Sequence, residues 1–384
     1  MEIVLPTIIP CQRSEFEIPE NVTYYNCAYM SPLAKDIQDI GVSSVSAKAQ
    51  PWLIQPEHFF SGSNAVRKLF ARLVNCLGED VSILPSVSYG IGIAACNLSL
   101  GKGRHVIVLE DQFPSNYYPW VELAEMNQGE VLIVSRPVDG DWTRAVLNTI
   151  SNCTAIVALP HCHWTDGSLL DLVAIGKYCK EQDIPLVVDA TQSLGVLPLD
   201  VQEVRPAFLV AAAYKWLLGP YSVALMYCAP EYQNGRPLEF NWITRAGSEN
   251  FSGLVSYTDR LCDGAAKYDV GERSNFALLP MVAKALEKIL DWGVSNISET
   301  LGRYNAEIAK GAACLGFLLP PAAHSSPHLL GLRFPEKLPE NVVSSLASKN
   351  IFVSVRGNAI RVAPHLYNNE EDRARFLDAL KAEL

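Results

Sequence analysis

Seven short, almost continuously apolar runs recur between residues 81 and 227, and helical or mixed stretches separate most of them. A strand that is buried on both faces shows such a run, whereas a strand with one wet face alternates apolar and polar residues. Parallel strands also need long crossover connections, usually helices. The pattern therefore predicts an α/β fold with a mostly parallel sheet that is covered on both faces. The runs are Val81–Leu84, His105–Leu109, Val131–Val134, Thr154–Leu159, Ile184–Val188, Phe208–Ala212 and Ser222–Tyr227.

The chain divides into three parts by composition and rhythm. Three prolines in residues 1–20 disfavour a regular helix and predict an extended arm. The apolar runs belong to a large domain that we place at residues 21–255, where the sequence becomes polar, glycine-rich and aromatic towards its end. Residues 256–384 combine amphipathic helices with three strand-like segments, which predicts a smaller α+β domain.

The composition argues against several classes of function. The net charge is −10, and no cluster of lysine and arginine offers a surface for nucleic acid. The ten cysteines are scattered without a CxxC pair, which favours reduced thiols over a disulfide framework. No segment resembles a signal peptide or is apolar for long enough to cross a membrane. We therefore expect a cytoplasmic protein without nucleic-acid or membrane partners.

Two of the apolar runs end on ionisable residues. Asp189 follows one run, and Tyr214 and Lys215 follow another. Charged groups are costly at the ends of buried strands unless something pairs with them, and ligands of open α/β sheets bind at these strand ends. Each residue alone is equally well explained as a loop cap or a solvated lysine. Together they suit pyridoxal phosphate, which needs a lysine amine for a Schiff base and an acid beside its ring nitrogen.

Four motifs then add a resemblance to a known family. They are FPSNYYPW (Phe113–Trp120), DATQSLG (Asp189–Gly195), AYKWLLGP (Ala213–Pro220) and IRVAPHLYNNEED (Ile360–Asp372). In this order, over most of the chain, they resemble the class V aminotransferase family of fold-type I pyridoxal-phosphate enzymes, to which kynureninases, isopenicillin N epimerases and cysteine desulfurases are related. The resemblance implies a large cofactor domain, a smaller C-terminal domain that closes over it, and a homodimer with its sites at the interface.

The resemblance implies a catalytic role for Lys215, which would form the Schiff base and carry a proton between substrate carbons. It implies that Asp189 pairs with the pyridine nitrogen and that Gln192 reaches the ring oxygen. Phe113 would stack on the cofactor ring. Arg361 would bind the substrate carboxylate, for which its planar guanidinium offers two parallel hydrogen bonds.

The same resemblance assigns the cofactor phosphate to the turn PSVSYG. Val87 and Ser88 would bind the phosphate there through backbone amides and a hydroxyl, at the N-terminus of a helix. Tyr214 would add its own hydroxyl. Trp242 and Asn275 align more loosely with positions that complete the neighbouring subunit's site.

The chain departs from the family at three places. Alanines precede Tyr214, where relatives often carry a phosphate-binding serine. The last cysteine is Cys314, and none lies near Arg361 in the sequence, which argues against a persulfide-forming desulfurase. Gln192 stands where kynureninases typically carry histidine, which weakens that assignment.

Two other motifs suggest different chemistry. GIGIAA (Gly90–Ala95) spells a dinucleotide fingerprint, so an NAD(P)-dependent oxidoreductase is a remote alternative. His161 and His163 offer half of a metal site, but no further ligand is evident, so we predict no metal. His163 and Trp164 also follow a predicted strand end, where they would line a substrate pocket. No G-x-S-x-G motif supports a hydrolase.

We therefore predict a pyridoxal-phosphate-dependent class V aminotransferase that acts on an amino acid or a related carboxylated amine. A carbon–sulfur lyase or an epimerase is the alternative, because transamination, racemisation and β-elimination all follow removal of the same α-proton. A non-catalytic relative that keeps the fold as an interaction surface is a third hypothesis, against which Lys215, Asp189 and Arg361 argue. The side chain that the site recognises does not follow from these motifs.

Overall fold

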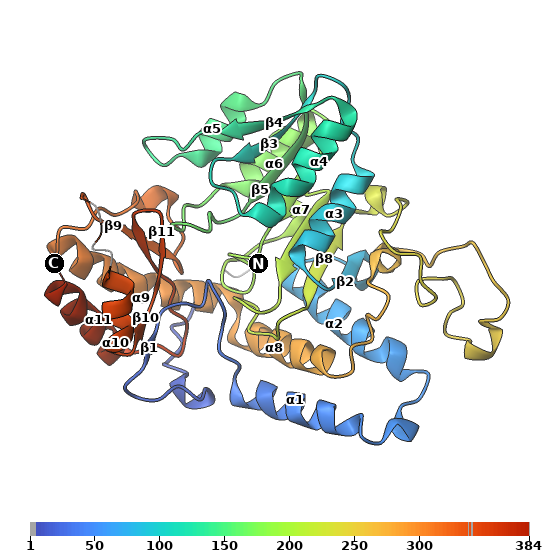
Figure 1. The fold of residues 1–384 in the computed structure, drawn as a ribbon, viewed down its shortest axis with the longest axis horizontal. Coiled ribbons are helices and arrows are strands. Elements are labelled where there is room, and N and C mark those ends of the chain that lie inside the picture. The colour runs from blue at the N-terminus through green and yellow to red at the C-terminus, as the bar shows by residue number, and fades with distance from the viewer. Residues whose placement is uncertain (1–4, 337, 339–340, 384) are drawn as a thin grey trace.

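A twisted sheet of seven strands forms the centre of the larger part of the molecule (Figure 1). This computed structural model describes residues 5–336, 338 and 341–383. The strand order is β2-β8-β7-β6-β5-β3-β4, and the pairings among β3 to β7 are all parallel, so the predicted α/β fold is confirmed. The strands are β2 (Val81–Leu84), β3 (His105–Leu109), β4 (Glu130–Val134), β5 (Thr154–Pro160), β6 (Leu186–Asp189), β7 (Phe208–Ala212) and β8 (Ala224–Cys228).

Strand β8 is the exception to the parallel arrangement. It pairs antiparallel with both β7 and β2. Residues 213–223 alone join β7 to β8, and a parallel neighbour would need a crossover of about a dozen residues or more, usually with a helix. This short return reverses the direction of β8, and the sheet is therefore mixed.

Helices cover both faces of the sheet, and alternate strand residues divide between two cores. In β7, Leu209 and Ala211 pack into one core, whereas Phe208 and Val210 pack into the other. The first core includes α2, α5, α6 and α8, and the second includes α3 and α4. Burial on both faces explains why the strands are continuous apolar runs in the sequence. These helices are α1 (Lys35–Ala47), α2 (His58–Val74), α3 (Val87–Asn97), α4 (Tyr118–Asn127), α5 (Trp142–Thr149), α6 (Leu172–Glu181), α7 (Val201–Val204) and α8 (Leu278–Trp292).

The C-terminal part of the chain forms a smaller unit with its own core. Its antiparallel sheet has the order β11-β12-β9, and α9, α10 and α11 pack with it around a separate set of apolar residues. The N-terminal strand β1 joins this unit by pairing with β10. The elements are β1 (Thr23–Tyr24), α9 (Val294–Cys314), β9 (Leu330–Arg333), α10 (Val342–Ser348), β10 (Ile351–Phe352), β11 (Ser354–Arg356), β12 (Ala359–Val362) and α11 (Glu370–Ala382).

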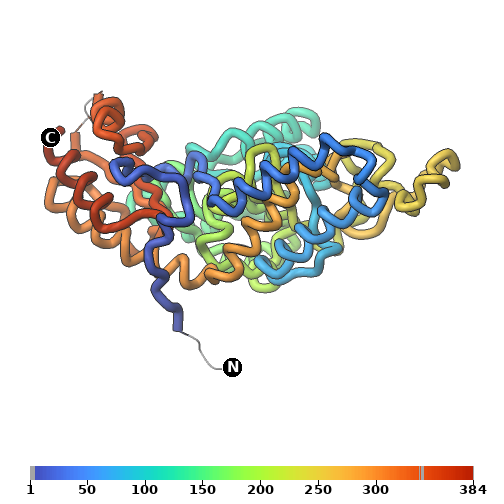
Figure 2. Tube along the Cα trace, turned by 90° about the horizontal axis from the view of Figure 1, so that it is seen from below, coloured from blue at the N-terminus to red at the C-terminus, as the bar shows by residue number. Residues whose placement is uncertain are grey.

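Helix α8 packs with the large sheet, because it contacts α1 and α2 and shares their core. Our division of the chain between residues 255 and 256 remains a prediction, and these contacts favour a later boundary near Gly293, where α8 ends. Between η5 (Pro230–Tyr232) and η7 (Ala265–Tyr268), the chain projects from the end of the molecule opposite the smaller unit (yellow in Figure 2). This projecting segment has no counterpart in the sequence prediction.

Two expectations from composition can be compared with the structure. All ten cysteines are free thiols, and four of them are buried. In the part of the chain that is described, no helix is both long enough and apolar enough to span a membrane.

A buried carboxylate, Asp269, ties several elements of the large unit together. It accepts hydrogen bonds from Arg67 of α2, from Arg273 at 2.6 Å, and from the backbone N–H of Ile83 in β2 at 2.7 Å. The side chains of the acid and of both arginines are almost completely inaccessible to solvent. Because two guanidiniums share one carboxylate away from water, loss of the acid would leave both charges buried without a partner.

The substitution Asp269→Ala is therefore expected to lower the free energy of unfolding by about 3–5 kcal/mol, the usual cost of breaking a buried ion pair. The midpoint of urea unfolding, followed by tryptophan fluorescence, measures this loss. Asp263→Ala is the matched control, because Asp263 is 89% exposed and pairs with Arg260 at the surface. An unchanged midpoint in Asp269→Ala would mean that the two arginines find other partners.

Candidate active site

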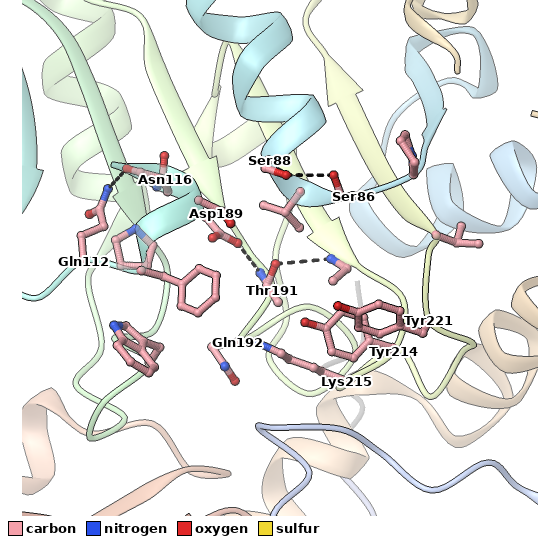
Figure 3. Close-up of a pocket in the computed structure, with 18 of the residues that line it drawn as sticks. Ser86, Ser88, Gln112, Asn116, Asp189, Thr191, Gln192, Tyr214, Lys215 and Tyr221 are labelled. Atoms are coloured by element: carbon pink, nitrogen blue, oxygen red, sulfur yellow. Dashed lines mark hydrogen bonds between the residues drawn. The ribbon is translucent and has the colours of Figure 1, made fainter. Parts of the chain in front are cut away.

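A pocket opens where β6 and β7 end, at the carboxyl edge of the large sheet (Figure 3). The segment after β3, the N-terminus of α3 and the turn between β7 and β8 form its other walls. All seven residues predicted to bind the cofactor line this pocket, which has a volume of about 230 Å³. They are Val87, Ser88, Phe113, Asp189, Gln192, Tyr214 and Lys215.

Asp189 is the last residue of β6, and the turn that follows holds its carboxylate. Its Oδ1 accepts the backbone N–H of Thr191 at 3.0 Å, and Thr191 Oγ1 in turn accepts the N–H of Ala212 at 3.3 Å. Asp189 is 7% exposed, and burial raises the pKa of its carboxyl, while Thr191 and Lys215 oppose the rise. Thr191 therefore positions the acid. The sequence motifs did not identify this role, although an Asp-x-Thr turn is a local signal for it.

The amine of Lys215 lies close to two aromatic rings. Its Nζ is 5.3 Å from the centre of the Phe113 ring and 5.5 Å from that of Tyr214. Lys215 is 6% exposed, and it forms no ion pair within 4.0 Å in the described part of the chain. Burial lowers the pKa of Lys215 to about 8, whereas the charge of Asp189 opposes this shift. Part of the amine is therefore neutral and nucleophilic near neutral pH.

Asp189 and Lys215 thus share a pocket without pairing with each other. A buried acid and a buried amine normally form an ion pair, because an uncompensated charge in a protein interior is costly. Here both side chains face the same pocket, and their charged atoms are more than 4.0 Å apart. The arrangement fits a group that needs an amine on one side and an acid on the other, as pyridoxal phosphate does.

The N-terminus of α3 provides hydrogen-bond donors for an anion. Ser86 caps the helix by accepting the N–H of Tyr89 at 3.2 Å, and its hydroxyl lies 2.9 Å from the hydroxyl of Ser88 (Figure 3). The backbone N–H groups of Val87 and Ser88 have no intrahelical acceptors, because they lie at the start of the helix. The helix dipole adds to their attraction for a phosphate group.

Hydroxyl groups from another segment stand near the place of the missing serine before Tyr214. The turn between β7 and β8 brings Tyr221 and Ser222 to the pocket. The rings of Tyr214 and Tyr221 are 4.5 Å apart, so two phenols lie together at this wall (Figure 3). The sequence contained no signal for this contribution, because it depends on the short return that reverses β8.

Two amide side chains line the pocket, and they differ in how far their hydrogen bonds are already used. Gln192 donates from Nε2 to Ala28 O at 3.0 Å and accepts at Oε1 from Trp216 Nε1 at 2.8 Å. Asn116 accepts at Oδ1 from Trp120 Nε1 at 3.0 Å, but its buried Nδ2 has no acceptor among the described residues. A buried donor at a pocket wall calls for a ligand oxygen. Asn116 is therefore a stronger candidate than Gln192 for a contact to the ring oxygen.

Arg361 lies behind the pocket wall, on β12 of the smaller unit. It donates from Nε to Ser354 Oγ at 3.0 Å and from Nη1 to Trp164 O at 2.9 Å, and Trp164 lines the pocket. Arg361 is 1% exposed, and no carboxylate of the described residues lies within 4.0 Å of its guanidinium. Burial, helped by the charge of Arg356, lowers its pKa to about 9, so the group stays charged at neutral pH. A buried cation without an acid partner favours an anionic ligand.

One cysteine reaches this region of the molecule. Cys162 lines the pocket, and its Sγ is 3.4 Å from Ser326 Oγ. Burial raises the pKa of this thiol to about 12, and the nearby charge of Arg361 offsets only part of the rise. Folding therefore brings a cysteine towards Arg361 that sequence distance had hidden. The thiolate, which is the reactive form, is not populated at neutral pH.

The two histidines around Cys162 do not take part in the pocket. His163 is fully buried and stacks on Trp142 at 5.5 Å between ring centres, so the prediction that it lines the substrate pocket is wrong, whereas Trp164 does line it. His161 is also buried, and burial lowers its pKa to about 4. Within the described ranges, no group of three or more potential metal ligands forms around either histidine.

The remaining candidates also lie away from the pocket. The GIGIAA motif falls inside α3, where a Cβ on Gly90 would come within 2.9 Å of Val210 and Leu84. Close packing of helix on sheet explains this glycine, and the strand-to-helix turn of a dinucleotide site is not formed by the motif. Trp242 and Asn275 line a separate depression at the surface.

Comparison with known proteins places this site in context. Residues 56–369 match the family described as Aminotransferase class-V. The uncharacterized aminotransferase YcbU of Bacillus subtilis (strain 168) is 27% identical over 92% of this chain and 91% of its own length. Other relatives bear the names kynureninase and probable cysteine desulfurase.

Solved structures share the fold over nearly the whole chain. A C-DES variant with glycine covalently linked to its PLP cofactor has a TM-score of 0.87 at 18% identity, covering 97% of this chain and 100% of its own. The apo cysteine desulfurase from Thermococcus onnurineus NA1 has a TM-score of 0.85 at 17% identity, covering 97% and 98%. At this identity the likeness establishes the architecture and leaves the reaction open.

Removal of the Asp189 charge is expected to make the Lys215 amine less basic. A nearby carboxylate favours the ammonium form, so Asp189→Asn should move the pKa of Lys215 below 8 and increase the neutral fraction at neutral pH. Acylation of Lys215 in the cofactor-free protein, quantified by mass spectrometry as a function of pH, should then be about threefold faster at neutral pH. Asp263→Asn, at an exposed loop position, should leave the rate unchanged. An equal or slower rate in Asp189→Asn would contradict the coupling.

Proposed function

The chain belongs to the aminotransferase class-V family, and we propose that it is a pyridoxal-phosphate-dependent enzyme that acts on an amino acid or a related amine with a carboxylate. The observation that carries this proposal is that Lys215 and Asp189 are buried in one pocket and held apart. Pyridoxal phosphate makes use of both groups, whereas a nicotinamide cofactor has no need of a buried amine.

Residues of the pocket supply each contact that the cofactor requires. Lys215 offers the amine for the covalent link, and Asp189, held by Thr191, offers the acid for the ring nitrogen. Phe113 offers an aromatic face. The free N–H groups at the start of α3, together with the hydroxyl of Ser88, offer donors for the phosphate.

The chain's own groups would then handle the substrate. When bound, pyridoxal phosphate supplies an electron-poor ring that stabilises negative charge on the carbon next to the substrate amine. Lys215 Nζ, whose pKa of about 8 suits it to both tasks, would accept the proton from this carbon and later return it. Arg361 would hold the carboxylate in a fixed direction. Phe113 and Trp164, whose ring centres are 5.4 Å apart, would exclude water.

The position at which Lys215 returns the proton separates the reactions. We propose transamination, which the description of YcbU as an aminotransferase supports. A carbon–sulfur lyase or an epimerase is the alternative, in line with the desulfurase and kynureninase relatives. The buried, protonated thiol of Cys162 argues against a relay of sulfur through a persulfide.

The purified protein is expected to show a visible absorbance band with pyridoxal phosphate that shifts when its amino-acid substrate is added. Lys215→Ala should lose the covalent adduct that borohydride fixes in the wild-type protein. Lys180→Ala, at an exposed position near Glu231, should retain it. The product, whether a keto acid, an inverted amino acid or a sulfide, then distinguishes the reactions. A protein without the band, or a fixed adduct in Lys215→Ala, would refute the proposal.

We also propose that the protein is a homodimer. Large apolar side chains lie exposed along α1, after it, and on the projecting segment, which is more apolar surface than a soluble monomer usually presents. The depression lined by Trp242 and Asn275 also includes Val45 of α1, so these regions are continuous. In a twofold dimer this surface would face its own copy, with Trp242 and Asn275 near the partner's site. The exposed residues are Val42, Val45, Trp52, Leu53, Leu238, Phe240, Trp242, Val255 and Tyr257.

Light scattering is expected to give twice the chain mass of 42.2 kDa. Val255→Asp, on the projecting segment, should shift the protein towards the monomer, because a buried charge would oppose association. Val138→Asp is the control, since Val138 is also fully exposed but lies in the turn between β4 and α5. A monomeric wild-type protein, or the same shift in both variants, would exclude this interface.

A further inference from the structure

Two arginines lie on the same face of the hairpin formed by β11 and β12. In the register of this pair, Ser354 is opposite Arg361, and Arg356 is opposite Ala359. Directly opposite residues share a face of the sheet, and so do residues two apart along a strand. Arg356 and Arg361 therefore project from one face, and the small side chain of Ala359 lies beside them.

Both guanidiniums meet the same residue of the pocket wall. Arg361 donates to the carbonyl oxygen of Trp164 at 2.9 Å, and the guanidinium carbon of Arg356 lies 5.3 Å from the centre of the Trp164 ring. Trp164 in turn lines the pocket and packs edge-on against Phe113 at 5.4 Å. The two cations are thus one side chain away from the space that Lys215 faces.

The positive charge at this end of the pocket is not balanced by the protein. Neither Arg356 nor Arg361 has a carboxylate within 4.0 Å in the described part of the chain, and Asp189 is the acid that lines the pocket. The charges of both arginines lower the pKa of Lys215, which places them within electrostatic reach of its amine. This local excess contrasts with the net charge of −10 for the whole chain.

Arg356 also keeps most of its hydrogen-bonding capacity free. Its described hydrogen bond runs from Nη1 to the backbone oxygen of Val355 at 2.8 Å. The contact with the Trp164 ring engages the flat face of the guanidinium, so the N–H groups at its edge remain available. A half-buried arginine that an aromatic ring holds in place is well suited to bind a carboxylate through two hydrogen bonds.

We propose that Arg356 makes this site selective for substrates with two anionic groups, that is, for amino acids with an acidic side chain. Arg361 binds the carboxylate next to the amine, and Arg356 binds the carboxylate at the end of the side chain. The amine chemistry at Lys215 rests on the function proposed above, but the preference for a dianion rests on the two arginines. A site built this way rejects the neutral side chain, because an uncompensated guanidinium is left behind.

Binding of simple carboxylates to the holoenzyme tests the preference without any reaction. Glutarate and valerate, like succinate and butyrate, match in chain length and differ in the second carboxylate. Calorimetry on the wild-type protein should show at least about tenfold tighter binding of each dicarboxylate than of its partner. Arg356→Gln should abolish this difference and leave the affinity for valerate and butyrate unchanged. Arg361→Gln should weaken all four ligands.

Arg303→Gln is the matched control, because Arg303 is an exposed arginine of the same unit that pairs with Glu299 on α9. It removes the same charge and should retain the preference. Equal weakening of mono- and dicarboxylates in Arg356→Gln would mean that both arginines grip a single carboxylate, and it would overturn the proposal. If Arg356→Gln fails to fold, Arg356→Lys and the wild-type comparison decide, and equal affinities for glutarate and valerate in the wild-type protein refute it.

Amino acids then separate this inference from the proposed function. Aspartate and glutamate should shift the cofactor absorbance at concentrations at least about tenfold lower than asparagine and glutamine, which match them in size. A shift with the amides at equal or lower concentration would overturn the dianion preference and leave the cofactor chemistry standing. No shift with any amine, together with intact dicarboxylate preference, would overturn the proposed function and support the role of Arg356.

Discussion

The active pocket depends on a buried acid and a buried amine that are kept from neutralising each other. Asp189 ends β6, and Lys215 follows β7, the neighbouring parallel strand in the sheet. Parallel pairing brings both strand ends to the same edge, and Thr191 links them by accepting from Ala212 while it donates to Asp189. The free energy of two uncompensated charges is supplied by the surrounding fold, which is large enough to carry it. The proposed cofactor would compensate both charges at once.

The second half of the site comes from a different unit of the fold. The hairpin of β11 and β12 carries Arg356 and Arg361, and Trp164 from the large sheet is the residue that both of them touch. This contact joins the side of the pocket where a substrate carboxylate would bind to the side where the amine acts. The spacing between the two units therefore sets which substrate fits, and Trp164 is the point at which that spacing is transmitted.

The sequence predicted the large sheet well because its signal is local. Burial on both faces is recorded in each strand's own residues, so the bounds of β2, β3 and β7 agree with the structure. The predicted site residues converge because the family motifs follow strand ends and helix starts, whose positions the topology determines. The direction of β8 was not recognised, since it depends on the length of a return rather than on composition. His163 was misplaced for a related reason, because its stacking partner Trp142 is distant in the sequence.

By itself, the sequence determined the fold class, the family and the two groups that define the pocket, Asp189 and Lys215, because these depend on apolar runs and short motifs of contiguous residues. Tertiary structure alone decided which other side chains surround them. The free donor of Asn116, the approach of Ser222 and the nearness of Cys162 to Arg361 all depend on contacts between distant segments. The shared face of Arg356 and Arg361 depends on strand register, which no local pattern records.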